Sequence, residues 1–117
     1  MDGSVRINEE TLRHAATHRS HFMWPWEAPP HSIASGILDD ETYDWLAVLR
    51  GMAASGGSAV VADEDTLAQA RDLAQDVAGI AASATGAAGL AGVLQLQRQG
   101  LIQPGARVGV LFTGVSR

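Results

Sequence analysis

The sequence contains neither cysteine nor lysine, and each absence excludes a class of chemistry. Without cysteine, the 117-residue chain has no disulfide bond, no thiolate nucleophile and no sulfur ligand for zinc. All eight basic residues are arginine, so no lysine amine is present to form a Schiff base with a carbonyl cofactor. Any chemistry that needs such an amine requires a group from outside these 117 residues.

The chain also lacks a surplus of basic residues and a long apolar run. Its net charge of −5 disfavours nucleic acid and anionic membranes as partners, because both attract basic patches. No apolar stretch reaches transmembrane length, and the first ten residues lack the apolar core of a signal peptide. We therefore expect a cytoplasmic protein with at most one globular domain.

The C-terminal third, residues 79–114, organises the rest of the chain. It reads as a small-residue helix that Thr85 caps, a Pro-Gly turn, and an apolar strand at Val108–Phe112. A continuous apolar run is typical of a parallel strand buried on both faces. Ligands in open α/β sheets lie beyond the carboxyl ends of strands, so Thr113 and Gly114 are candidate ligand contacts. The alternative is that Thr113 caps the strand and Gly114 turns the chain.

Capping residues and apolar stripes predict more elements upstream. The expected helices are Glu9–Arg19 with Asn8 as N-cap, Asp39–Ala54 ended by Gly56, and a helix from Asp63 to Gly79; Ser58–Ala62 is the expected strand. This alternation predicts an α/β protein, a fragment of a three-layer αβα fold with a short parallel sheet flanked by helices. Residues 1–21 are interpreted as an N-terminal extension or short helix, and 22–117 as the C-terminal α/β portion.

Three glycines, Gly86, Gly89 and Gly92, leave one side of the predicted third helix without side chains. Glycine weakens a helix, so this side needs a compensating contact. Close packing against a strand or helix is the structural explanation. Approach of the helix start to an anionic ligand is the functional explanation, and the two are compatible.

Two further clusters have both a structural and a functional interpretation. Trp24 and Trp26 either cover a core or meet another chain, because exposing both in water is costly. His14, His18 and His21 have helical spacing, which would suit a metal. However, no further ligand follows at a convincing spacing, so we favour a solvated helix face.

The chain resembles the C-terminal part of fold-type II pyridoxal-phosphate enzymes, most closely threonine synthase-like proteins. Three consecutive stretches carry the resemblance: SIASGILDDETYDWLAVLRGMAASGG, SAVVADEDTLAQARDLAQDVAGI and TGAAGLAGVLQLQRQGLIQPGARVGVLFTG. The resemblance implies that the Thr113 hydroxyl bonds the pyridine nitrogen of pyridoxal 5'-phosphate and that Gly114 lets the backbone pass close to the ring. It also implies cofactor contacts from Ser83 and Gly86 and a substrate contact from Ser35.

The implied reaction is γ-elimination from a phosphorylated homoserine followed by addition of water to give threonine. The chain departs from the family pattern at Ser83 and Ala84, where an acidic or small polar residue and a proline are usual. It also lacks the Schiff-base lysine and the glycine-rich phosphate loop, so we expect it to be inactive alone. Two alternatives stay open: a threonine or serine dehydratase-type fragment, and a non-catalytic interaction module. The expected partners are an amino-acid substrate and either a second copy or the missing N-terminal portion.

Overall fold

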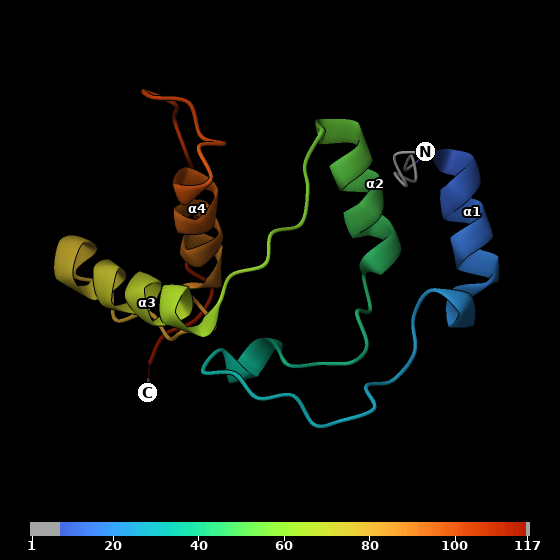
Figure 1. The fold of residues 1–117 in the computed structure, drawn as a ribbon, viewed down its shortest axis with the longest axis horizontal. Coiled ribbons are helices and arrows are strands. Elements are labelled where there is room, and N and C mark those ends of the chain that lie inside the picture. The colour runs from blue at the N-terminus through green and yellow to red at the C-terminus, as the bar shows by residue number, and fades with distance from the viewer. Residues whose placement is uncertain (1–7, 117) are drawn as a thin grey trace. The chain divides into compact units, whose positions relative to one another are not determined.

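A computed structural model describes residues 8–116, so part of the predicted N-terminal extension, residues 1–7, lies outside the described residues. Its elements are α1 (Glu9–Thr17), η1 (Arg19–His21), η2 (Ser35–Ile37), α2 (Trp45–Ser55), α3 (Glu64–Ala78) and α4 (Ala88–Arg98), where η marks a short 3₁₀ helix (Figure 1). None of these helices combines the length and the apolar character needed to cross a lipid bilayer. The chain divides into two units that alternate along the sequence.

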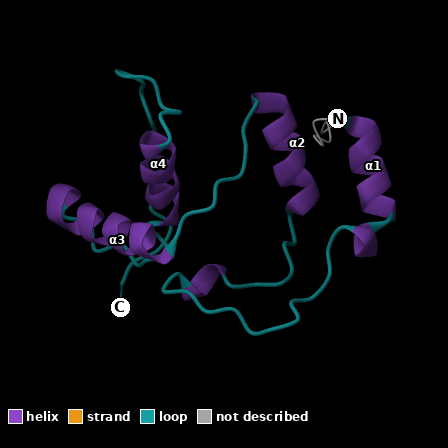
Figure 2. Ribbon diagram, viewed as in Figure 1, coloured by secondary structure: helices purple, strands orange, loops and turns teal. Residues whose placement is uncertain are grey.

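The predicted α/β fold is wrong, because the described residues form helices and no sheet (Figure 2). Their only β pairing is an isolated antiparallel bridge between Ala82 and Val115. The expected strands at Ser58–Ala62 and Val108–Phe112 make no backbone hydrogen bonds within the described chain. An apolar run shows that a segment seeks burial, but a strand also needs a neighbouring backbone, and neither segment has one here.

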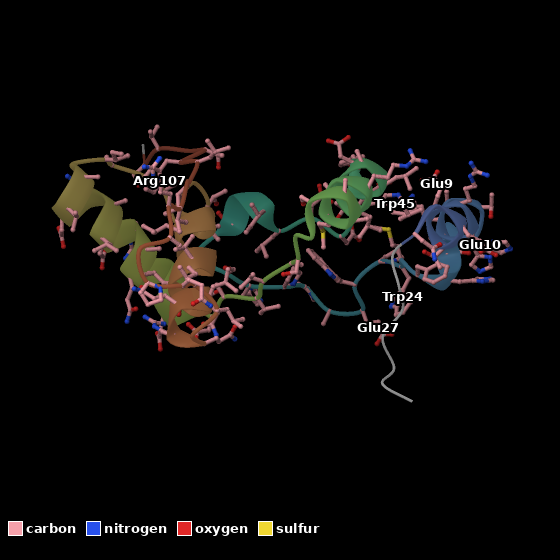
Figure 3. The ribbon with its side chains drawn as sticks, turned by 90° about the horizontal axis from the view of Figure 1, so that it is seen from above. Glu9, Glu10, Trp24, Glu27, Trp45 and Arg107 are labelled. Carbon is pink, nitrogen blue, oxygen red and sulfur yellow. The ribbon has the colours of Figure 1, made fainter. Side chains whose placement is uncertain are left out.

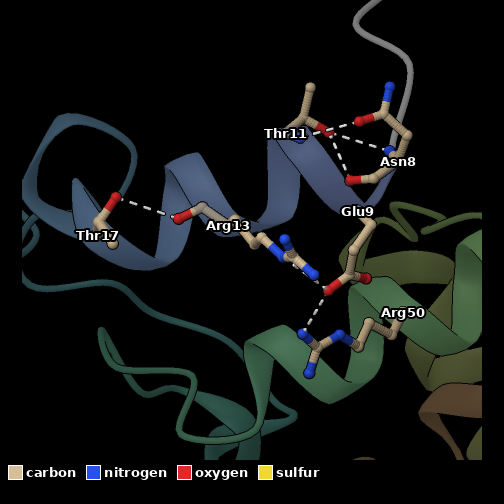
Figure 4. Close-up of polar contacts among 6 residues, drawn as sticks. All are labelled: Asn8, Glu9, Thr11, Arg13, Thr17 and Arg50. Atoms are coloured by element: carbon tan, nitrogen blue, oxygen red, sulfur yellow. Dashed lines mark hydrogen bonds and ion pairs between the residues drawn. The ribbon is translucent and has the colours of Figure 1, made fainter.

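Unit 1 comprises two stretches of the chain, one that ends at Pro29 and the other Asp39–Ala59, and it contains α1, η1 and α2. Asn8 caps α1 as predicted, because its side-chain oxygen accepts the Thr11 N–H at 2.9 Å. Figure 1 shows α1 and α2 running in opposite directions side by side. Glu9 of α1 joins them through an ion pair with Arg50 of α2 at 2.9 Å (Figure 4). The Arg50 hydrogen bond and charge lower the pKa of the Glu9 carboxyl.

The apolar stripe of α2 remains without a buried core. Leu12 is the only described residue of unit 1 that is buried, and no residue of α2 is buried. Trp45, Leu49 and Met52 are half-buried, whereas Val48 is exposed. A pair of helices this short cannot enclose an apolar stripe by itself, so unit 1 presents apolar side chains to its surroundings.

Unit 2 contains α3, α4, η2 and the C-terminal segment, and its core consists mainly of alanine. The buried cluster comprises Ala34, Leu67, Ala70, Ala74, Ala82, Ala84, Ala87 and Ala91. Small side chains let α3 and α4 approach closely. A polar link crosses the same contact, where Arg98 of α4 donates to the buried Thr66 hydroxyl of α3 at 2.8 Å and also to Gln69.

The predicted helix ends were right where a left-handed glycine follows the helix. Gly56 and Gly79 have φ values of 71° and 66°, a region that glycine occupies without strain. Two predicted starts were wrong. The Asp39–Ala54 helix begins instead at Trp45, and the Thr85 cap is replaced by Ala87.

The start of α3 was predicted correctly and that of α4 was not, for one physical reason. Asp63 accepts the Thr66 N–H at 2.8 Å, as an N-cap does. The Thr85 hydroxyl instead accepts the Gly36 N–H at 2.9 Å, a contact 49 positions away in sequence. A capping rule uses only residues close in sequence. It therefore cannot predict that the Gly36 N–H, which is distant in sequence, would bond the Thr85 hydroxyl.

Candidate functional site

Four of the five predicted site residues lie together in unit 2 and form what we call the Ser83–Gly114 cluster: Ser83, Gly86, Thr113 and Gly114. The Ser83 N–H donates to the Gly114 carbonyl at 3.1 Å, and the Thr113 N–H donates to the Gly86 carbonyl at 3.2 Å. The Ser83 hydroxyl accepts the Gly86 N–H at 3.0 Å. Two of these hydrogen bonds therefore join the turn before α4 to the C-terminal segment, and the third lies within the turn.

The two glycines of the cluster are in direct backbone contact. A Cβ at Gly86 would lie 2.1 Å from the carbonyl oxygen of Gly114 and 2.5 Å from its nitrogen. A Cβ at Gly114 would lie 3.0 Å from the Ser83 hydroxyl oxygen. Close packing thus accounts for glycine at both positions, and cofactor contact at either glycine stays a prediction.

The glycine side of α4 also packs, although only in part. A Cβ at Gly89 would meet the Leu111 carbonyl at 3.7 Å and the Val110 side chain at 3.8 Å, both ordinary contacts. Nothing lies within 4 Å of a Cβ at Gly92. The C-terminal segment therefore passes the first turn of α4 and leaves the position of Gly92 open.

Thr113 presents its hydroxyl from a fixed backbone. The residue is exposed, and its N–H is bonded to Gly86, while the preceding Phe112 packs against the buried core. Within residues 8–116 the Thr113 hydroxyl has no hydrogen-bond partner. It can therefore donate to or accept from a ligand without first breaking an internal bond.

Ser35 lies on the 30–38 loop beside this cluster. The neighbouring Gly36 N–H is bonded to Thr85, one residue before Gly86, so the loop meets the turn before α4. The other side of the loop is held by Glu64, which accepts the Ile33 N–H at 2.8 Å. Hydrogen bonds from the Ser32 hydroxyl and from Ile33 lower the pKa of the Glu64 carboxyl.

The chemistry that this arrangement offers is hydrogen bonding through hydroxyl and backbone groups. Beyond the cluster, the Ser116 N–H bonds the Ala81 carbonyl at 2.8 Å, and the Ser116 hydroxyl bonds the Ala82 carbonyl at 3.3 Å. No ionisable side chain takes part in the hydrogen bonds of the cluster among the described residues. The cluster can position a ligand, but proton transfer would need a group from elsewhere.

The His14 and His18 rings in unit 1 stack at 4.3 Å, and His18 lies 5.5 Å from His21. Within the described residues, no three histidine, cysteine or acidic side chains are grouped to hold a metal. His14 lies in α1 and His18 caps it, whereas His21 lies in η1.

Sequence reasoning missed a groove in unit 1. About 380 Å³ in volume, it is lined mainly by apolar side chains of α1, α2 and the segment after η1, including Phe22, Trp45 and Met52. Neither Trp24 nor Trp26 is buried, with exposed fractions of 64% and 47%. Figure 3 labels Trp24. The α2 stripe and the paired tryptophans were the available signals.

Comparison with known proteins adds no assignment: no family model, no curated protein and no solved structure matches the chain. The resemblance to threonine synthase-like enzymes consequently stays a prediction from the sequence.

Proposed function

We propose that this chain forms the ring-nitrogen side of a pyridoxal 5'-phosphate site in a threonine synthase-like lyase. The observation that supports the proposal is the convergence of Ser83, Gly86, Thr113 and Gly114 from two segments about thirty residues apart in sequence. Those positions were selected from the sequence resemblance, and no local rule requires them to meet. The lysine that would anchor the cofactor lies outside these 117 residues, because the chain has none.

Thr113 is the residue that would meet the cofactor ring. Its backbone is held by Gly86, its hydroxyl is free among the described residues, and no charged side chain takes part in the contacts of the cluster. A neutral hydroxyl pairs with an unprotonated pyridine nitrogen, whereas a carboxylate would hold that nitrogen protonated. Pyridoxal phosphate supplies the electron sink when bound, and a neutral partner suits elimination and replacement better than transamination.

The hydroxyls of Ser83 and Ser35 differ in how far they are available to hydrogen-bond a ligand. The Ser83 oxygen already accepts the Gly86 N–H, but its own proton remains available for donation. Ser35 is exposed on a loop that Thr85 and Glu64 hold in place. We assign Ser83 to the cofactor and Ser35 to the amino-acid substrate.

The substrate class follows from the resemblance: a phosphorylated homoserine, with γ-elimination followed by water addition. A threonine or serine dehydratase is the alternative reaction within the same superfamily. Thr113 would face the ring nitrogen in both, so this chain does not discriminate between the two. The residues that read the substrate side chain would belong mainly to the lysine-bearing portion.

The test is a titration of the ¹⁵N-labelled chain with pyridoxine 5'-phosphate, followed by two-dimensional NMR. This probe keeps the ring nitrogen and phosphate but has no aldehyde, so it cannot react with the N-terminal amine. We expect amide shifts at Ser83, Gly86, Thr113 and Gly114. Thr113→Val, which is similar in shape, should abolish them, and Thr113→Ser should retain them.

A matched control is Thr17→Val in unit 1, whose hydroxyl bonds only within α1 and its C-terminal cap. That variant should bind the probe as the parent does. Amide shifts confined to residues next to arginines would count against the proposal. So would amide shifts that persist in the Thr113→Val variant. So would the absence of any response at probe concentrations approaching its solubility.

A second candidate is a non-catalytic interaction module, and a specific observation in unit 1 favours it. Trp24 is 64% exposed and Tyr43 is 75% exposed, in the unit that also has the apolar groove. Aromatic side chains in such a setting are frequent anchors of protein interfaces. Iodide quenching of tryptophan fluorescence tests this: quenching that is strong in dilute protein and declines with concentration supports the module, and equal quenching throughout argues against it.

A further inference from the structure

The segment Val108–Phe112, which we call the open stretch, has backbone groups without partners. Its N–H and carbonyl groups make no backbone hydrogen bonds within the described chain. Burial alternates from Gly109 to Phe112: Val110 and Phe112 are half-buried, whereas Gly109 and Leu111 are exposed, Leu111 to 82%, and Val108 at the beginning of the stretch is 49% exposed. A period of two is the signature of extended backbone, so the open stretch has the geometry of a strand without a neighbour.

The two edges of the open stretch differ. In extended backbone, the N–H and carbonyl of one residue point to one edge and those of the next residue to the other. The odd-numbered edge faces α4, because the Leu111 carbonyl lies near Gly89 and the Thr113 N–H bonds Gly86. The even-numbered edge carries the free groups of Val108, Val110 and Phe112.

At both ends of the even-numbered edge, the next backbone group already makes a hydrogen bond within the chain. The Gly114 carbonyl accepts the Ser83 N–H at 3.1 Å, and the Ala106 N–H donates to the Gln103 carbonyl at 3.1 Å. The Ser83 bond belongs to the antiparallel contact around the Ala82–Val115 bridge. The open edge therefore extends from Val108 to Phe112 and no further.

The open stretch also lacks the features that keep exposed edges from pairing. Natural edge strands are protected by proline, charged side chains or bulges. The sequence VGVLF has none of these, and the nearest charge is Arg107 at its beginning (Figure 3). Unpaired, apolar and β-branched, this edge has the character of an interface.

We propose that the open stretch pairs with the same stretch of a second copy, antiparallel, with a two-fold axis at Val110. Each copy then offers Val108, Val110 and Phe112 as hydrogen-bonding residues, giving about six backbone hydrogen bonds in all. A register centred on Leu111 would need Gly114, which Ser83 occupies, and one centred on Gly109 would need Ala106, whose N–H Gln103 occupies. Val110 is the one centre that uses the entire open edge.

The side chains are self-complementary in this register, which is why the second copy is the occupant. Val108 lies opposite Phe112 of the second copy, an aromatic and β-branched pair of the kind that stabilises sheets. Leu111 lies over Gly109 of the second copy, which has open space where a side chain would be. Arg107 lies opposite Thr113, so no like charges face each other. A two-fold interface of this kind closes at the dimer.

The first test is sedimentation velocity over a range of concentrations. The parent chain should show a concentration-dependent monomer–dimer equilibrium. Val110→Pro removes an N–H from the even edge and should abolish the dimer, whereas Gly109→Pro removes one from the odd edge and should retain it. A strictly monomeric parent, or a dimer that survives Val110→Pro, would overturn the proposal. The second outcome would assign association to the aromatic surface of unit 1 instead.

The second test fixes the register and does not depend on proline being tolerated. Because the chain has no cysteine, a single introduced cysteine reports only on its own copy in the partner. Opposed residues in a hydrogen-bonded pair have Cα atoms about 5.5 Å apart, within disulfide reach. Val110→Cys should form a covalent dimer on mild oxidation. Val108→Cys should stay monomeric on a non-reducing gel, because two copies of residue 108 would lie about 14 Å apart. Equal crosslinking of both variants would refute the register.

Discussion

Replacing Gly86 with alanine probes the contact on which the candidate site depends. The new Cβ would lie 2.1 Å from the Gly114 carbonyl oxygen, and side-chain carbons essentially never approach other atoms closer than 3.0 Å. One of the two backbones must therefore move by about 0.9 Å, the difference between these distances. Gly86 does not have a positive φ, so alanine meets no conformational penalty of its own. The destabilisation therefore comes from the contact.

The magnitude follows from the bonds that this movement breaks. Separating Gly86 from Gly114 lengthens the hydrogen bonds Thr113–Gly86 and Ser83–Gly114, at 3.2 and 3.1 Å, beyond useful range. Each contributes about 1 kcal/mol, in line with the 1–3 kcal/mol typical of overpacking. The lower unfolded-state entropy of alanine offsets about 0.4–1 kcal/mol. We expect a net loss of about 1–2 kcal/mol in the free energy of unfolding.

Gly92→Ala is the matched control, because it makes the same change six residues later, inside α4. Nothing lies within 4 Å of its new Cβ, and alanine is about 0.5–1 kcal/mol better than glycine inside a helix. The two substitutions should therefore shift stability in opposite directions. Urea unfolding followed by far-ultraviolet circular dichroism measures both. A Gly86→Ala variant as stable as Gly92→Ala would refute the close approach of Gly86 and Gly114.

Three other predictions concern the framework around α3. Hydrogen bonds lower the pKa of the Asp63 and Glu64 carboxyls, chiefly from Thr66 to Asp63, so their stabilisation is complete above the unfolded values near 4. It should fall as pH decreases through the lower folded-state values, seen as declining urea midpoints between about pH 5 and pH 2. Thr66→Val removes the hydroxyl that Arg98 donates to and should cost about 1 kcal/mol in chemical denaturation. Gly79→Ala places a side chain at φ 66° and should lower the melting temperature, with about 1 kcal/mol lost.

The sequence predicted the helical elements well because their signals are local. Asn8 and Asp63 accept backbone N–H groups three residues ahead, and Gly79 follows α3 in the left-handed conformation. Each of these bonds joins residues close in the chain, so a short window contains the whole cause. The Asp39–Glu41 acids failed as a helix start for the converse reason. Asp39 accepts the Glu41 N–H in a local turn instead.

The strands could not be predicted in the same way. A strand needs hydrogen bonds to the backbone of a second segment, and the sequence of one segment does not show whether such a partner exists. The SAVVA and VGVLF runs have strong β character, yet Val61 is 89% exposed and Leu111 is 82% exposed. Their composition was interpreted as burial within a sheet of this chain. In the structure these apolar segments have no pairing partner. Their composition therefore indicated that they seek burial, but not which surface would bury them.

The candidate site and the open edge use different backbone groups of one segment, so the two proposals can be tested separately. Pairing of two copies would use the N–H and carbonyl groups of even-numbered residues. Thr113 is odd-numbered, its N–H is bonded to Gly86, and its side chain lies on the exposed face with Leu111. A Val110→Pro chain should therefore still show probe-induced shifts at Thr113, and a Thr113→Val chain should still dimerise. If one substitution removed both properties, the C-terminal segment would act as a single structural unit, and neither effect could be assigned to the residue that was changed.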